Sequence, residues 1–132
     1  MAKFSELSQS RLATCDERLQ RIFREVIKHY DCTVLCGHRD EHSQMEAYRS
    51  GHSKLRFPQS KHNSFPSRAV DVSPTPIDWK DTIRFYHFAG FVMATSIQLG
   101  IKLRHGGDWD SDFNFSEEKF KEAAEAYEVL SD

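Results

Sequence analysis

A histidine and an aspartate that lie nine residues apart could hold one metal ion in this chain. His62 ends the short sequence Ser60-Lys61-His62, and Asp71 lies between Val70 and Val72. An imidazole nitrogen and a carboxylate oxygen are two of the standard donors to zinc. The alternation around Asp71 is typical of a short strand, with the carboxylate on the opposite face to the two valines. We therefore expect the intervening turn to bring both side chains to one ion.

Two other polar clusters lie on either side of this pair. Gly37-His38-Arg39, with Gln44, comes before it, and Gly106-Gly107-Asp108-Trp109 comes after it. Arg39 would offer fixed hydrogen-bond donors to a developing oxyanion or to a substrate carboxylate. A simpler interpretation makes Arg39 a solvated side chain and the glycine cluster a turn. Taken in order along the chain, the three clusters favour a hydrolytic metal site.

Composition limits the classes of function. The chain has 132 residues and a net charge of -2, which predicts a single domain over residues 1–132 and gives no indication of nucleic-acid binding. The sequence has no apolar run long enough to cross a membrane and no apolar signal core near its start, so we expect no membrane insertion and no signal peptide. Cys15, Cys32 and Cys36 are odd in number, and we expect them to be reduced thiols in the core.

The elements that would position these clusters follow from periodicity and capping residues. We expect helices over residues 16–29, 40–49, 78–99 and 117–130, and strands over residues 33–36, 69–72 and 101–103. Asp16 is placed to cap the first of these helices, and Asp78 or Asp81 to open the third, which Gly100 closes. The last helix is predicted because Ala, Glu and Lys dominate it, with Phe120, Ala123, Ala124, Tyr127 and Leu130 on one face. The fold class predicted is α+β, a small antiparallel sheet with helices packed on it.

With these motifs in order, the chain resembles a known family. Gly37-x-Arg39 with Gln44, Gly51-x-Ser53, Ser60-Lys61-His62, Ala69-Val70-Asp71 and Gly106-Gly107-Asp108-Trp109 are similar to motifs of the zinc D,L-peptidases of phage endolysins. These include D-alanyl-D-alanine carboxypeptidases and L-alanyl-D-glutamate peptidases, and the likeness is greatest to those of small single-stranded DNA phages. The resemblance spans about residues 8 to 120 and implies cleavage of a peptide bond in the stem peptides of peptidoglycan.

The resemblance also implies roles for particular residues. His62 and Asp71 match the family's zinc ligands, and Arg39 matches the arginine that orients or polarises the substrate. The family then ends in a segment like Phe-x-Asp-x-x-His-x-Glu, which supplies the general base and the third ligand. Aligned from Phe120 without gaps, Glu122 falls at the base and Glu125 at the third ligand. No histidine follows His105.

Three interpretations of this ending remain open. Glu125 replaces the histidine as a zinc ligand, or the end of the chain has been replaced by a solvated helix, or the chain is a non-catalytic, degenerate domain that binds cell-wall peptides. Among the other histidines, only His105 lies near the expected site. We expect the protein to be a monomer held in the bacterial host cytoplasm until it is released to the cell wall, with a holin or another lysis partner.

Overall fold

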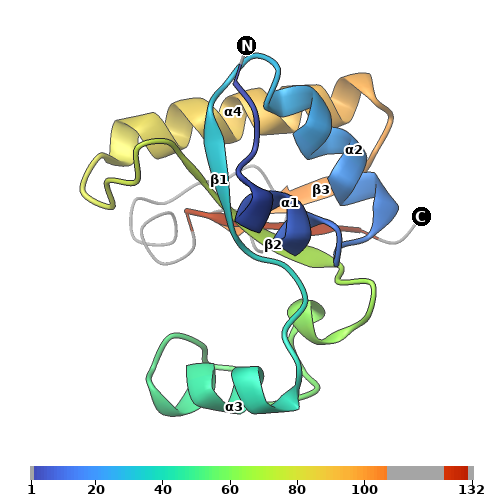
Figure 1. Cartoon of the computed structure of the whole chain (residues 1–132), viewed down its shortest axis with the longest axis vertical. Coiled ribbons are helices and arrows are strands. Elements are labelled where there is room, and N and C mark those ends of the chain that lie inside the picture. Colours follow the sequence, from blue (N-terminus) through green and yellow to red (C-terminus); the bar gives the residue numbers. More distant parts are fainter. Residues whose placement is uncertain (1, 107–123, 131–132) are drawn as a thin grey trace.

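The structure is a computed structural model that describes residues 2–106 and 124–130. Its elements, in chain order, are α1 (Glu6–Leu12), α2 (Glu17–Val26), β1 (Cys32–Cys36), α3 (Glu41–Arg49), the 3-10 turn η1 (Lys61–Asn63), β2 (Ala69–Pro74), α4 (Thr82–Gln98), β3 (Leu103–His105) and β4 (Ala126–Val129). Figure 1 shows α3 at the bottom of the molecule, apart from the other helices, with a long loop returning from it to β2.

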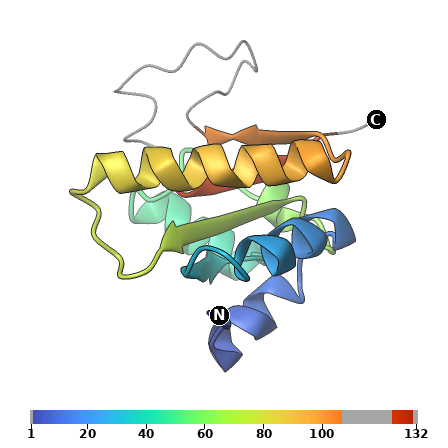
Figure 2. The same ribbon diagram turned by 90° about the horizontal axis from the view of Figure 1, so that it is seen from above.

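The described strands form one antiparallel sheet in the order β1-β2-β4-β3. Helices α2 and α4 pack against each other and cover one face of this sheet, which Figure 2 shows from above. Val34, Val70, Val72, Tyr127 and Val129 point to that face and are almost fully buried. The predicted α+β class, an antiparallel sheet with helices packed on it, is confirmed.

The predicted capping residues are found at the helix ends. The Asp16 side chain accepts a hydrogen bond from the backbone of Arg18 at the start of α2, and Asp81 does the same for Arg84 at the start of α4. Gly100 follows α4 with a φ of 71°, a conformation that glycine adopts without steric cost. Helix α1, which periodicity did not reveal, begins at the cap Ser5 and packs against β1.

Strand β1 carries an irregularity next to the predicted site. Val34 pairs with Val72, but Cys36, not Leu35, pairs with Asp71, so one extra residue lies in β1. Such a bulge turns the following side chain toward a new direction. Gly37 comes next, where a Cβ atom would lie 2.3 Å from the Arg11 carbonyl oxygen at the end of α1. The close approach of α1 therefore requires glycine at this position.

The predicted C-terminal helix is wrong over residues 126–129. Ala126–Val129 is strand β4, inserted between β2 and β3, because Tyr127 and Val129 fill the core while Ala126 and Glu128 face the other way. Pairing with two neighbouring strands outweighs the helix propensity of Ala and Glu. Residues 107–123, with Glu122 and most of the glycine-rich cluster, lie outside the described residues.

Strand β3 differs slightly from its predicted bounds. Strand β3 covers Leu103–His105, two residues later than predicted at each end. Over the residues that the structure describes, no helix combines the length and the apolar character needed to cross a membrane.

Candidate metal centre

The short turn η1 fixes the position of His62. The Ser60 side chain accepts a hydrogen bond from the His62 backbone, and the Asn63 side chain bonds back to the Ser60 backbone. The His62 carbonyl in turn accepts a hydrogen bond of 2.8 Å from the backbone N–H of Arg39. The backbone of His62 is therefore tied both to its own loop and to the segment after β1.

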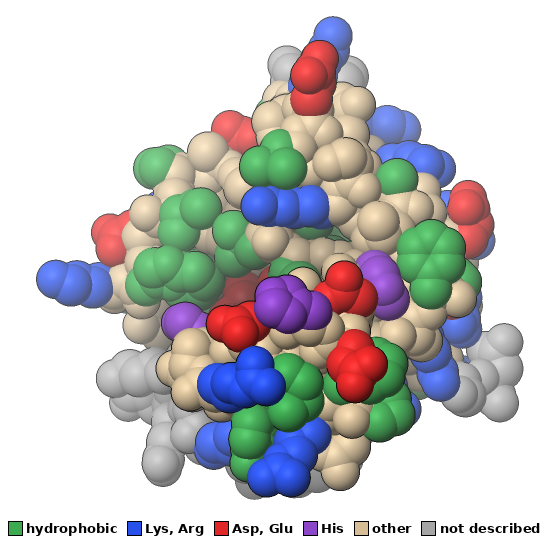
Figure 3. Space-filling model, turned by 60° about the horizontal axis from the view of Figure 1, so that its bottom comes forward, with side chains coloured by type: hydrophobic (Ala, Val, Ile, Leu, Met, Phe, Trp, Pro, Cys, Tyr) green, Lys and Arg blue, Asp and Glu red, His purple; other side chains and the backbone are tan. Residues whose placement is uncertain are grey.

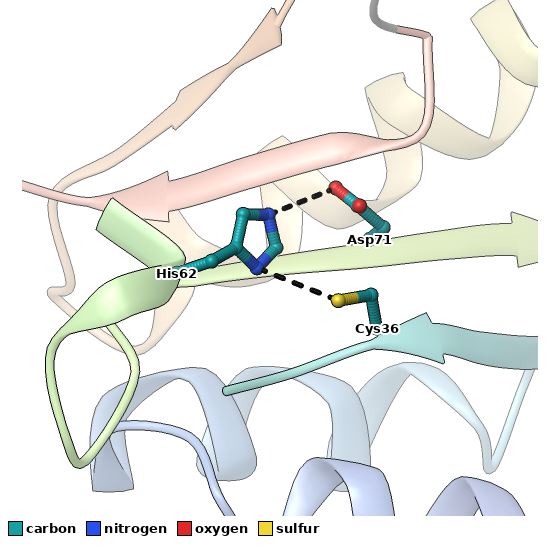
Figure 4. A group of neighbouring side chains, drawn as sticks. All are labelled: Cys36, His62 and Asp71. Carbon is teal, nitrogen blue, oxygen red and sulfur yellow. Dashed lines mark hydrogen bonds and ion pairs between the residues drawn. The ribbon is translucent and has the colours of Figure 1, made fainter. Parts of the chain in front are cut away.

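The two ring nitrogens of His62 have different surroundings. Nδ1 lies 2.7 Å from the Gly37 carbonyl oxygen, which can only accept a hydrogen bond, so Nδ1 carries a proton. Nε2 lies 3.3 Å from Oδ1 of Asp71. Figure 4 shows the His62 ring with one nitrogen toward Asp71 and the other toward Cys36. Histidines that bind metals in proteins commonly donate their other N–H to a backbone carbonyl or a carboxylate. His62 is thus oriented to offer Nε2, beside Asp71, to a cation.

Asp71 lies in the middle of the sheet, on the face opposite the core. Its neighbours across the two strand pairs are Cys36 on β1 and Ala126 on β4. The side chain is 18% exposed, and Oδ2 lies 3.7 Å from Nη2 of Arg39. The predicted strand around Asp71, with Val70 and Val72 on the opposite face, is present.

Arg39 points to the same place because other predicted motif residues hold it there. Its Nη1 donates to the Gln44 side chain at 2.9 Å, and the amide of this fully buried Gln44 donates to Ser53 and to the Leu55 carbonyl. The guanidinium lies beside Asp71 and beside the Cys36 sulfur, at 3.7 Å. The structure thus places Arg39 and His62 in one site.

The site carries unusual proton affinities in the absence of a cation. Burial alone would lower the pKa of His62, but its contacts with Asp71 and Cys36 outweigh burial and raise that pKa to about 10. Burial opposes ionisation of Cys36 too, yet its contact with His62 and the positive charges of His62 and Arg39 bring its pKa below the ordinary value. A metal ion would therefore compete with protons for the side chains of His62 and Cys36.

Glu125 reaches this site by strand pairing. Its carbonyl accepts a hydrogen bond of 2.9 Å from the backbone of Val72, which fixes Glu125 next to Asp71 in the sheet. Burial, followed by the negative charge of Asp71, raises the pKa of the Glu125 carboxyl to about 7, while His62 acts in the opposite direction. The sequence predicted Glu125 as a ligand within a helix, whereas in the structure Glu125 comes just before strand β4.

His105, the histidine beside the glycine-rich cluster that the sequence offered as a possible substitute ligand, has a structural role. It is buried on β3, packs against the ring of Tyr127, and its Nε2 lies 2.7 Å from the Ala124 carbonyl oxygen. The contact fastens the chain where it enters β4.

Sequence reasoning missed Cys36 as a site residue. Cys15 and Cys32 are buried as predicted, but Cys36 is only partly buried, and its sulfur lies 3.9 Å from Nδ1 of His62. Donor atoms of Cys36, His62 and Asp71 all lie within 4.8 Å of one another. Thiolate, imidazole and carboxylate are all zinc donors, so the residues present fit this ion. The position of Cys36 directly before the Gly37-His38-Arg39 motif is the sequence feature that could have indicated its place in the site.

A pocket lies on the His62 side of the centre. The pocket borders His62 and continues over Ala69 and Ala126 to Lys61 and Arg104. Figure 3 shows the face of the molecule that comes forward when the bottom of Figure 1 is turned toward the viewer, and acidic and histidine side chains lie close together on it.

Comparisons with known proteins identify the relatives of this chain. The chain is 31% identical over 121 residues to the L-alanyl-D-glutamate peptidase of Escherichia phage T5, an alignment that covers 88% of each chain. Its fold resembles the crystal structure of the Serratia marcescens L-Ala D-Glu endopeptidase ChiX, with a TM-score of 0.74, 21% identity, and coverage of 97% of this chain and 90% of the other. The profile of the phage L-alanyl-D-glutamate peptidases matches residues 1–129, and the chain therefore belongs to that family.

Proposed function

We propose that this protein is a zinc-dependent peptidase that hydrolyses the bond between L-Ala and D-Glu in the stem peptides of peptidoglycan. The observation that carries the proposal is the arrangement of His62, whose Nε2 faces Asp71 while Nδ1–H bonds to the Gly37 carbonyl. Family membership supports the substrate, and the donor set supports the metal. His62 and Asp71 would supply two of the ligands.

A zinc ion held in this way would supply Lewis acidity and lower the pKa of a bound water toward about 7. The remaining tasks belong to the chain. Arg39, held by Gln44, would donate hydrogen bonds to the oxygen on which negative charge develops. This role requires a guanidinium that is held in one position. The contacts of Arg39 with Asp71 and with the Cys36 sulfur hold it there.

Proton transfer requires a carboxylate near the reacting water. Sequence alignment puts Glu125 at the third ligand; strand pairing holds its backbone next to Asp71, and we propose it as the carboxylate that takes and releases this proton. Glu122, the predicted general base, stays a proposal. The pocket beside His62 would receive the peptide. We also propose that the enzyme acts as a monomer after release from the host cytoplasm to the wall.

Solubilisation of purified peptidoglycan tests the activity. Zinc-loaded protein should release new amino groups from the wall, and His62→Ala should release none because it lacks a ligand. Arg24→Ala, a change at an exposed position on α2, is the matched control and should leave the rate unchanged. Binding to peptidoglycan without release of amino groups would favour the alternative, a degenerate wall-binding domain, over the enzyme.

A further inference from the structure

The two strands beside Asp71 offer different groups to a cation. Antiparallel partners that lie opposite each other place their side chains on the same face of a sheet. Ala126 on β4 and Cys36 on β1 are the partners of Asp71. Ala126 has no donor atom, whereas Cys36 brings a thiol to the same face.

The bulge in β1 is what creates this arrangement. With the regular register that starts at Cys32 and Pro74, Leu35 would lie opposite Asp71, and an aliphatic side chain would face the carboxylate. The extra residue moves Cys36 into that position instead. Bulges occur often beside active sites, where they redirect a side chain.

Glu125 has a less favourable position as a ligand. It lies opposite Val72, just before the start of β4, so strand pairing fixes its backbone next to Asp71 but not the direction of its side chain. Among the described residues, the group whose donor atoms lie within 4.8 Å of one another contains Cys36, His62 and Asp71, and not Glu125.

We infer that Cys36 is the third protein ligand of the zinc centre, so that the set is Cys36, His62 and Asp71, with Glu125 left to accept the proton. This inference rests on the proposed zinc centre and specifies its ligands. A thiolate and a carboxylate together balance the two positive charges of zinc, and sites with three protein ligands keep a fourth position for water. Arg39 then lies against both anionic ligands at 3.7 Å, where it can hold them in place.

Cobalt substitution gives a readout that does not depend on activity. Protein loaded with Co²⁺ should show a thiolate-to-metal charge-transfer band in the near ultraviolet. Cys36→Ser should lose the band and bind zinc roughly ten-fold or more weakly. Mutation of a residue that only hydrogen-bonds to a metal ligand already lowers metal affinity by about that factor. Cys32→Ala, at the other end of the same strand, should keep both the band and the affinity. Glu125→Gln should keep the band as well.

Alkylation provides a second, independent readout on the same proteins. Cys36 is the partly exposed thiol, and Cys15 and Cys32 are buried, so iodoacetamide should modify Cys36 first in the chelated protein. Zinc should slow that reaction in the wild type and not in His62→Ala. Peptide mapping by mass spectrometry locates the modified residue.

The outcomes separate this inference from the proposed function. One outcome is tight metal binding that depends on His62, without a thiolate band and with loss of the metal in Glu125→Gln. That outcome would overturn the assignment of Cys36 and leave the proposed zinc peptidase standing. Absence of any metal binding by the wild type would overturn both. A band that disappears only in Cys36→Ser would establish the thiolate ligand.

Discussion

Substitution of Glu125 by Gln should change how the stability of the metal-free protein depends on pH. The folded protein holds the Glu125 proton with a pKa of about 7, against 4.5 for the ordinary side chain, because burial and Asp71 disfavour its charge. A carboxyl whose pKa is raised by folding costs no stability at low pH. The cost grows as pH rises above about 4.5, where the unfolded chain ionises first, and levels off above about 7.

The size of this effect follows from the two pKa values. One pKa unit corresponds to about 1.4 kcal/mol, so the wild type should lose on the order of 3 kcal/mol between pH 4.5 and pH 8 through this one group. Glutamine has no charge to bury, so the variant should not show that loss. Relative to the wild type, Glu125→Gln should therefore gain stability steadily across this pH range.

Urea unfolding in the presence of a chelator measures the difference. The free energy of unfolding would be determined at several pH values from 4.5 to 8 for the wild type, Glu125→Gln and Glu46→Gln. Glu46 forms an exposed pair with Arg49, and such pairs contribute little, so this control should follow the wild type. Parallel pH profiles for the wild type and Glu125→Gln would show that Glu125 is neither buried nor near Asp71, and would remove it from the centre.

Three further substitutions test other parts of the site. Calorimetric titration should detect no tight zinc binding by His62→Ala, and affinity equal to that of the wild type would exclude His62 as a ligand. Arg39→Ala should lower kcat/KM by about two orders of magnitude, as for loss of an oxyanion donor, and unchanged hydrolysis would exclude that role. Gly37→Ala should destabilise the fold by about 1–3 kcal/mol in thermal unfolding, because the new Cβ would lie 2.3 Å from the Arg11 carbonyl oxygen. An unchanged midpoint would contradict that contact.

The sequence was a good guide where local chemistry decides the structure. Asp16 and Asp81 cap helices, and the alternation around Asp71 gives a strand, because hydrogen bonding and burial along a short segment determine these features. His62 and Asp71 could be paired because their donor types and spacing suit one ion.

The sequence misled where distant strands decide the structure. In β4, Tyr127 and Val129 alternate with Ala126 and Glu128. An alternation over four residues is too short to outweigh the helix prediction from the longer Ala- and Glu-rich segment that contains it. The segment forms a strand because it can pair with β2 on one side and β3 on the other, and these partners lie far away in the sequence. Cys36 was missed because a free cysteine is usually buried, and the bulge that redirects it depends on the register with β2.

The central claim is that this centre cleaves one defined peptide bond with the help of a metal. A stem peptide that contains the L-Ala–D-Glu linkage would be incubated with zinc-loaded protein, with chelated protein, and with chelated protein given zinc again, and the products identified by mass spectrometry. We predict one cut, between L-Ala and D-Glu, which chelation abolishes and zinc restores. Cleavage that continues undiminished after the metal has been removed, or a cut at another bond, would contradict the proposed function.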